Sequence, residues 1–112
     1  MTFLGGTGGR RSSTGAITHT VTTAMPAVVS SLALEFGPVR INLIAPGFVD
    51  TPLSADLLGD DIEKRRQELR DTLPIGRVVG PQDVAALAVH LMTNTALTGA
   101  TYDIDGGQQF VA

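Results

Sequence analysis

The 112-residue sequence contains no cysteine, no tryptophan and a single tyrosine, and it has no excess of basic residues. Without cysteine the chain forms no disulfide, no thiolate metal site and no cysteine nucleophile, and a reducing compartment is compatible with this composition. Eight basic and eleven acidic residues give a net charge of -3. Such a balance indicates neither a nucleic-acid-binding surface nor an attraction to anionic lipid. We therefore expect a small molecule or another protein as the partner.

Long hydrophobic runs are absent as well. No run of about 18 apolar residues occurs, and "MTFLGGTGGRR" lacks the charged segment and long apolar segment of a signal peptide. We expect no membrane span, no signal peptide and a cytoplasmic location. No group of histidine and carboxylate residues has metal-ligand spacing, so no metal site is expected. With 43% hydrophobic and 17% charged residues, the chain 1–112 is predicted to form one globular domain.

The apolar pattern predicts strands and helices in alternation. Short β-prone or continuous apolar runs that end at glycine predict strands, whereas apolar residues at i, i+3 and i+4 predict helices. The expected strands are 1–4, 39–48 and 100–105, and the expected helices are 16–36, one that begins at Pro52, 60–72 and 81–92. This order favours βαβ units in a parallel sheet, and hence the α/β class. A three-stranded sheet has two exposed edges, so we expect a second copy or another partner to cover one.

The position of Pro26 leaves the start of the first helix undecided. Pro26 would cost about 3 kcal/mol or more inside a helix, so the helix either begins near Met25 or is kinked there. Further along, Thr51 is a typical N-cap, and Asp60 or Asp61 is a candidate cap for the helix that follows. That helix mixes both charge signs, which predicts a solvated face with pairs such as Asp61–Arg65.

Three single residues have mainly structural interpretations. His90 falls between the apolar positions of its helix and is expected to be exposed. Tyr102 is expected to pack or to meet an interface. Arg77 is expected to pair with Asp105 and so to tie the loop before the last helix to the last strand.

Two stretches closely resemble the second half of the short-chain dehydrogenases/reductases: "VRINLIAPGFVDTPLS", residues 39–54, and "LPIGRVVGPQDVAALAVHLMTNTALTGATYDIDGGQ", residues 73–108. The resemblance implies the C-terminal portion of a doubly wound Rossmann-like parallel sheet, with about three strands and three to four helices. It also implies an NAD(P)-dependent oxidoreductase acting on CH–OH or C=O groups of a small-molecule substrate. The matching residues are Asn42, Pro46, Gly47 and Thr51; Gly80, Pro81, Asp83, Val84 and Ala85; and Asp105, Gly106 and Gly107.

The Pro46–Gly47 turn is the candidate cofactor-binding feature. Ligands of open α/β sheets lie beyond the carboxyl ends of the strands, where a turn without a Cβ lets backbone groups reach them. The resemblance implies that the Val49 backbone and the Thr51 hydroxyl hold the carboxamide of NAD or NADP. The alternative is that Pro46–Gly47 only ends a strand and that Thr51 only caps a helix.

The catalytic positions of the family are substituted. The resemblance places the family's tyrosine at Thr18, its lysine at Thr22 and its serine at Gly5. The chemistry requires a phenol whose pKa is lowered by an ammonium group, and a threonine hydroxyl is far too weakly acidic to replace it. His19 is the one titratable group of the segment. Its pKa suits proton transfer, but a lone histidine among threonines is more typical of a solvated or hydrogen-bonded surface residue.

The glycine-rich segment 5–9 is a second departure. The family's phosphate-binding glycine turn belongs to the first half of its fold, which this chain does not contain, so the choice between NAD and NADP is not encoded here. "GGTGG" lacks the third glycine of that motif and has no acidic residue about 20 positions later. We interpret it as a loop in place of the catalytic-serine loop, although Arg10 and Arg11 could meet an anion.

Three hypotheses remain. The chain is a divergent member of an oxidoreductase family that is not expected to be active by itself, a truncated portion of a longer protein, or a non-catalytic pseudo-enzyme that acts as an oligomerisation or regulatory module. Family members commonly pair through the long helix and through the last helix and strand. Residues 60–71 correspond to a region that covers the substrate in the family, which suggests a lid.

Overall fold

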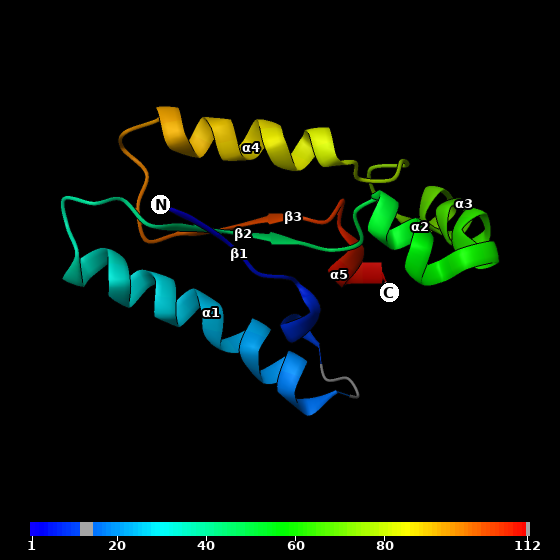
Figure 1. Cartoon of the computed structure of the whole chain (residues 1–112), viewed down its shortest axis with the longest axis horizontal. Coiled ribbons are helices and arrows are strands. Elements are labelled where there is room, and N and C mark those ends of the chain that lie inside the picture. The colour runs from blue at the N-terminus through cyan, green and yellow to red at the C-terminus, as the bar shows by residue number, and fades with distance from the viewer. Residues whose placement is uncertain (12–14, 112) are drawn as a thin grey trace.

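The computed structural model describes residues 1–11 and 15–111, and shows three parallel strands between helices (Figure 1). The strands are β1 (Thr2–Leu4), β2 (Asn42–Pro46) and β3 (Thr101–Ile104). The helices are α1 (Ala16–Glu35), α2 (Pro52–Leu58), α3 (Ile62–Thr72), α4 (Pro81–Thr93) and α5 (Gln108–Val111), with 3-10 turns η1 (Gly8–Arg10) and η2 (Gly59–Asp61). The predicted α/β class is confirmed.

β2 is the central strand of the sheet. It pairs in parallel with β1, where Phe3 is opposite Leu43, and with β3, where Ile44 is opposite Tyr102. α1 lies along one face and α4 along the other (Figure 1). A strand covered on both faces is expected to be apolar throughout, which explains the continuous run in the sequence. β1 and β3 form the two edges of the described sheet.

The core lies between β2 and the two long helices. Val29 of α1 is fully buried against Ile41 and Leu43, and Phe3, Met25, Leu32 and Ala33 pack around them. On the other face α4 contacts β2 and buries Leu91. Met92, next to Leu91 in the same helix, is 60% exposed.

α1 is one continuous helix from Ala16 to Glu35, with Pro26 inside it. A start near Met25 is therefore wrong. Because Pro26 has no N–H to donate to the carbonyl of Thr22, one hydrogen bond of the helix is missing. The mean hydropathy of α1 is 1.3 over 18 residues, so by length and hydropathy alone the helix could cross a membrane. Core helices of soluble proteins also meet these two criteria. Val29 is its one buried residue.

The helix ends differ in part from the prediction. Thr51 caps α2 as expected, because its side chain accepts a hydrogen bond from the Ser54 N–H and Pro52 occupies the first helical position. Asp61, one of the two cap candidates, occupies the N-cap position of α3, but its side chain forms no capping hydrogen bond. In place of an Asp61–Arg65 pair, Arg65 lies 3.5 Å from Glu68.

Arg40 and Asn42 organise the connection from α4 to β3. The Arg40 guanidinium donates to the backbone carbonyls of Leu91, Met92 and Leu97 at 2.8 to 3.0 Å, which satisfies carbonyls at the end of α4. The buried Asn42 side chain donates to Leu97 at 2.9 Å and accepts from the Ala100 N–H at 3.4 Å. A polar residue inside the sheet is tolerated because both ends of its amide are paired.

Candidate functional site

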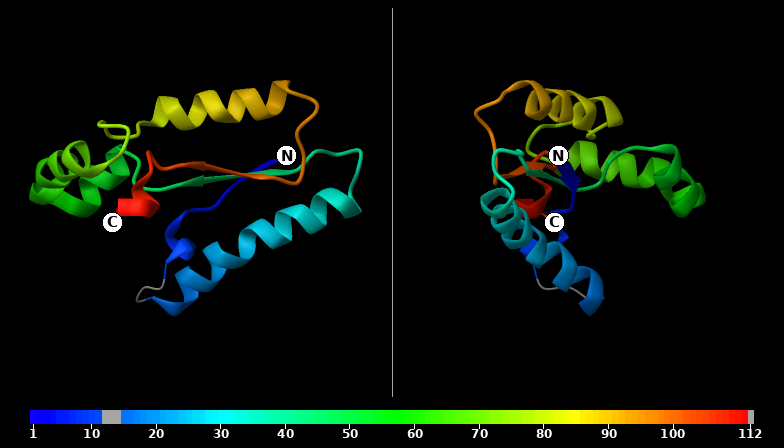
Figure 2. Two further views of the ribbon diagram at one scale, coloured as in Figure 1. Left: turned by 180° about the vertical axis from the view of Figure 1, so that it is seen from behind. Right: turned by 60° about the vertical axis from the view of Figure 1, so that its left-hand side comes forward.

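The carboxyl ends of the three strands meet at one end of the sheet (Figure 2). Residues 46–51 follow β2, the glycine-rich segment follows β1, and the turn 105–107 follows β3. These three segments form the place where open α/β sheets bind ligands.

The first segment, which we call the β2 loop (residues 46–51), is held by backbone contacts from two directions. The Phe48 N–H donates to the Gln108 side-chain oxygen at 2.8 Å, and the Asp50 N–H donates to the Val79 carbonyl at 2.9 Å. Gly47 has no room for a side chain, because a Cβ there would lie 2.5 Å from the Gln108 oxygen and 2.9 Å from the Asp105 Cβ. The loop is therefore fixed before any ligand arrives.

The predicted cofactor-binding residues Pro46, Gly47, Val49 and Thr51 all belong to the β2 loop, and all are partly buried. The Ser54 hydroxyl donates to the Val49 carbonyl at 2.7 Å, so the Thr51 hydroxyl, 3.0 Å from Ser54, is the donor in that second contact. Among the residues that the structure describes, the Val49 N–H has no acceptor. An amide carbonyl is the natural partner for such a group.

Asp50 connects the β2 loop to α3. Its two carboxylate oxygens accept hydrogen bonds from Nε and Nη2 of Arg66, both at 3.0 Å. Glu63 then joins Arg66 to Arg70, at 3.3 and 2.8 Å. Hydrogen bonds from Arg70 and Arg66 lower the pKa of Glu63, and those to Asp50 and Glu63 raise the pKa of Arg66.

The glycine-rich segment continues the line of β1. Gly5 donates to the Ile44 carbonyl at 2.8 Å and Thr7 to the Pro46 carbonyl at 3.1 Å. It then turns against α1: a Cβ on Gly9 would lie 2.5 and 2.8 Å from the hydroxyl oxygens of Thr23 and Thr22. The segment thus occupies the surface of α1 where the resemblance places the family's lysine.

The threonine hydroxyls of α1 are used within the helix. Thr20 donates to the Ala16 carbonyl at 2.7 Å, and Thr22 donates to the Thr18 carbonyl at 2.9 Å. Threonine commonly satisfies its hydroxyl in this way. Thr18 itself is exposed. Neither Thr18 nor Thr22 offers an acid near neutrality.

His19 lies on the part of α1 that faces η1. The hydroxyl of Thr23, one turn later, donates to the carbonyls of both His19 and Gly9. The His19 Nδ1 atom is buried and has no hydrogen-bond partner among the described residues. The His19 side chain as a whole is half-buried. A catalytic role for it remains a hypothesis.

The Arg10 side chain forms an ion pair with a residue of β3. Its guanidinium forms two hydrogen bonds with Asp103, at 2.6 and 2.8 Å, and the Gln109 side chain donates to the same carboxylate at 2.9 Å. An arginine paired in this way has less charge to offer an anion. The structure therefore favours the interpretation of this segment as a loop over a phosphate-binding turn. Residues 12–14, on the other side of Arg11, lie outside the described residues.

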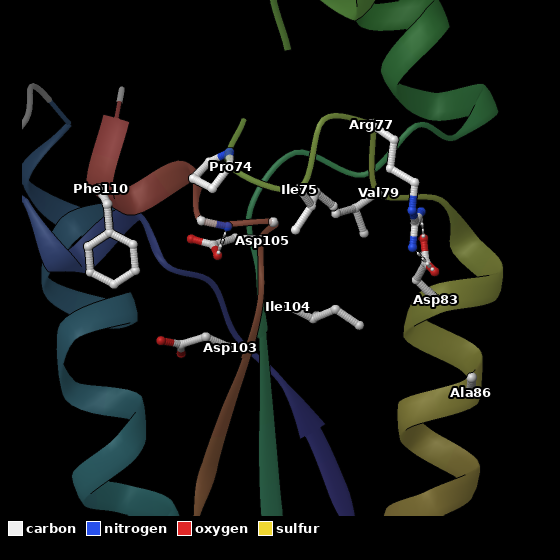
Figure 3. Close-up of a pocket in the computed structure, with 12 residues that line it drawn as sticks. Pro74, Ile75, Arg77, Val79, Asp83, Ala86, Asp103, Ile104, Asp105 and Phe110 are labelled. Carbon is white, nitrogen blue, oxygen red and sulfur yellow. Dashed lines mark hydrogen bonds and ion pairs between the residues drawn. The ribbon is translucent and has the colours of Figure 1, made fainter. Parts of the chain in front are cut away.

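An open pocket of about 540 Å³ lies beside β3, between the loop 74–79, α4 and α5 (Figure 3). Arg77 and Asp83 face each other at its rim, 2.7 Å apart. Hydrogen bonds from Arg77 and from the Gly80 N–H lower the pKa of Asp83 to about 2. The predicted Arg77–Asp105 pair is therefore wrong. Asp105 instead accepts from the N–H groups of Gly107 and Gln109 in its own turn.

The sequence interpretation missed Asp50, Arg66 and Gln108. Their contacts span 16 and 60 residues, and no local pattern encodes them. One available signal was the position of Asp50, a charged residue between two candidate ligand residues in a partly buried loop.

Comparison with known proteins matches this arrangement to one class: doubly wound α/β oxidoreductases. A family model described as enoyl-(acyl carrier protein) reductase matches residues 1–109. The chain belongs to the short-chain dehydrogenase/reductase family, and it corresponds to the C-terminal half of that fold. The predicted resemblance is confirmed.

Individual relatives agree with this assignment. The chain is 39% identical over 90 residues to 4-formylbenzenesulfonate dehydrogenase of Comamonas testosteroni, which covers 76% of the chain and 36% of that protein. A small-chain dehydrogenase in complex with NADPH superposes with a TM-score of 0.87 at 28% identity, over 96% of this chain and 50% of that one. The MalC reductase/Diels-Alderase of Malbranchea aurantiaca gives 0.87 at 27% identity, over 95% and 41%. The chain spans about a third of the length of the curated relatives it matches.

Proposed function

We propose that this chain forms the nicotinamide-binding half of an NAD(P)-dependent short-chain oxidoreductase, and that it is a divergent or truncated member without activity of its own. The observation that carries the proposal is the β2 loop: a fixed turn at the carboxyl end of the central strand, whose Val49 N–H has no acceptor among residues 1–11 and 15–111. The relative bound to NADPH supports a nicotinamide coenzyme.

The residues present fit one end of the coenzyme. Gly47 removes the side chain that would block the turn, Val49 supplies a donor for the carboxamide oxygen, and the Thr51 hydroxyl lies beside it as a second polar group. The coenzyme, when bound, supplies or accepts a hydride at its nicotinamide ring. The phosphate-binding glycine turn has to come from outside these 112 residues, so we expect weak binding by this chain alone.

The proton-transfer machinery does not fit the family's usual chemistry. A hydroxyl activated by a nearby ammonium is required, and Thr18 and Thr22 provide neither group. The hydroxyl of Thr22 is bound to its own helix. We therefore propose that the fold and the nicotinamide contact persist, whereas reduction of a carbonyl substrate by the tyrosine–lysine route does not.

Titration with NADH and NADPH, followed by coenzyme fluorescence, tests the proposal. The titration uses the chain and a longer polypeptide in which an upstream segment in register adds a strand, a glycine-rich turn and a helix. Thr51→Ala should weaken binding, Thr51→Ser should restore it, and Thr93→Ala, whose hydroxyl bonds only within α4, is the matched control. If neither polypeptide binds either coenzyme more tightly than about 1 mM, roughly -4 kcal/mol, the proposal is wrong.

A second candidate function is assembly without catalysis. Ile17 and Leu34 of α1 are 83% and 87% exposed, and β1 and β3 leave edges of the described sheet unpaired. We propose that a second copy or another protein covers one of these surfaces in a soluble, cytoplasmic assembly. Light scattering on the purified chain tests this, and a stable monomer at high concentration would refute it.

A further inference from the structure

The contact between Asp50 and Arg66 joins two parts of the site that are separate in the chain. Asp50 lies between Val49 and Thr51 in the β2 loop, and Arg66 lies in the middle of α3. The guanidinium meets the carboxylate with two parallel hydrogen bonds of 3.0 Å each. This fork geometry fixes the direction of both side chains as well as their distance, which a single contact would not do.

Asp50 and Arg66 each form one further contact besides the ion pair. The Asp50 N–H is bound to the Val79 carbonyl at 2.9 Å, so the backbone at Asp50 is anchored independently of its side chain. Arg66 also contacts Glu63 at 3.3 Å, one turn earlier in α3. A movement of α3 is therefore transmitted to the loop at the residue that separates Val49 from Thr51.

We propose that Arg66 is a positioning residue, which holds the β2 loop through Asp50 in the form that binds the coenzyme and thereby couples the placement of α3 to coenzyme binding. This inference rests on the proposed function. Coupling of this kind is reciprocal, so coenzyme bound at the loop also holds α3 in place. A covering helix would then be ordered when the coenzyme is present.

We expect the ion pair to contribute only modestly to the free energy of unfolding. Its side chains are 29% and 30% exposed, and a pair in contact with water contributes little to the free energy of unfolding. Removing it should therefore loosen the loop and α3 relative to each other while leaving the rest of the chain folded. This difference separates a positioning role from a merely structural one.

The experiment compares Arg66→Gln, Asp50→Asn and the double variant with Arg70→Gln. Arg70 is the matched control because its hydrogen bonds, to Glu63 and Gln67, stay within α3. Hydrogen–deuterium exchange of residues 47–51 is measured in the 112-residue chain, together with the urea midpoint. Coenzyme affinity is measured in the longer polypeptide that carries the upstream half.

Arg66→Gln and Asp50→Asn should each speed exchange in 47–51 and raise the coenzyme Kd by about three- to tenfold. The double variant should be no worse than either single one, because both remove the same contact. Arg70→Gln should match the wild type, and all urea midpoints should stay close together. Exchange or affinity in Arg66→Gln equal to the wild type, or an equal loss in Arg70→Gln, overturns the inference. If even the wild-type longer polypeptide binds no coenzyme, the proposed function fails, and the exchange data alone decide the positioning role.

Discussion

Gly9→Ala is the sharpest test of how the glycine-rich segment meets α1. The added Cβ would lie 2.5 Å from the Thr23 hydroxyl oxygen, 2.6 Å from the Thr23 backbone nitrogen and 2.8 Å from the Thr22 hydroxyl oxygen. Real Cβ atoms essentially never approach that closely, and the backbone nitrogen of a helix cannot rotate away. The segment, the helix or both must therefore move apart.

Gly8→Ala is the matched control, because a Cβ at Gly8 meets nothing within 4 Å in the described structure. Overpacking costs about 1 to 3 kcal/mol, so Gly9→Ala should lower the free energy of unfolding by that amount. Gly8→Ala should be neutral or stabilise by at most about 1 kcal/mol, through the entropy of the unfolded chain. The two variants should thus differ by about 1 to 4 kcal/mol, and near 4 °C per kcal/mol for a chain of this size their melting temperatures should differ by about 4 to 16 °C.

Urea and thermal denaturation, followed by circular dichroism, measure both variants in one buffer. Equal midpoints for Gly9→Ala and Gly8→Ala would refute the close packing of this segment on α1. A low midpoint for Gly9→Ala alone would show that the place of the family's lysine is filled by backbone.

Two further predictions concern pH and chemistry. Because the folded pKa of Asp83, about 2, lies below its ordinary value of 3.8, its pairing with Arg77 stabilises the fold above about pH 4, and this contribution is lost as the pH falls toward 2. Asp83→Asn should therefore flatten the loss of stability between pH 4 and pH 2 in urea titrations, and an unchanged acid slope would contradict the pairing. Thr18→Tyr with Thr22→Lys, in a polypeptide that includes the upstream half, should give a gain in nicotinamide-dependent carbonyl reduction, measured by coenzyme absorbance. The absence of any gain would mean that Pro26 or the glycine-rich loop has displaced the site.

The order of strands and helices was predictable because each element carries a local signal. The apolar run around β2 reflects burial on both faces, and Thr51 with Pro52 marks the start of α2 by capping chemistry alone. The family was predictable from the residues around Pro46–Gly47. The substitutions at Thr18 and Thr22 could also be read from the sequence, because the residues that match the family fix which positions correspond to its tyrosine and lysine.

Other features depend on contacts between distant residues. Arg77 pairs with Asp83, only six residues later, but this depends on how the loop approaches the first turn of α4. The pairing of Asp50 with Arg66 requires α3 to fold back over the β2 loop. The sequence alone could not decide how the helix treats Pro26. The cost of one missing hydrogen bond can be judged from the local sequence, whereas the packing that holds a 20-residue helix together depends on the rest of the fold.

The bonds of Arg40 also have a consequence for the order in which the chain folds. During synthesis Arg40 leaves the ribosome more than fifty residues before its acceptors at Leu91 and Leu97. At about 5 to 20 residues per second, the guanidinium spends several seconds without those carbonyls. Until the residues after Leu91 have been synthesised, β2 therefore lacks both its pairing with β3 and the contacts of Arg40. A nascent chain stalled before Leu91 is predicted to be the species that most needs a chaperone.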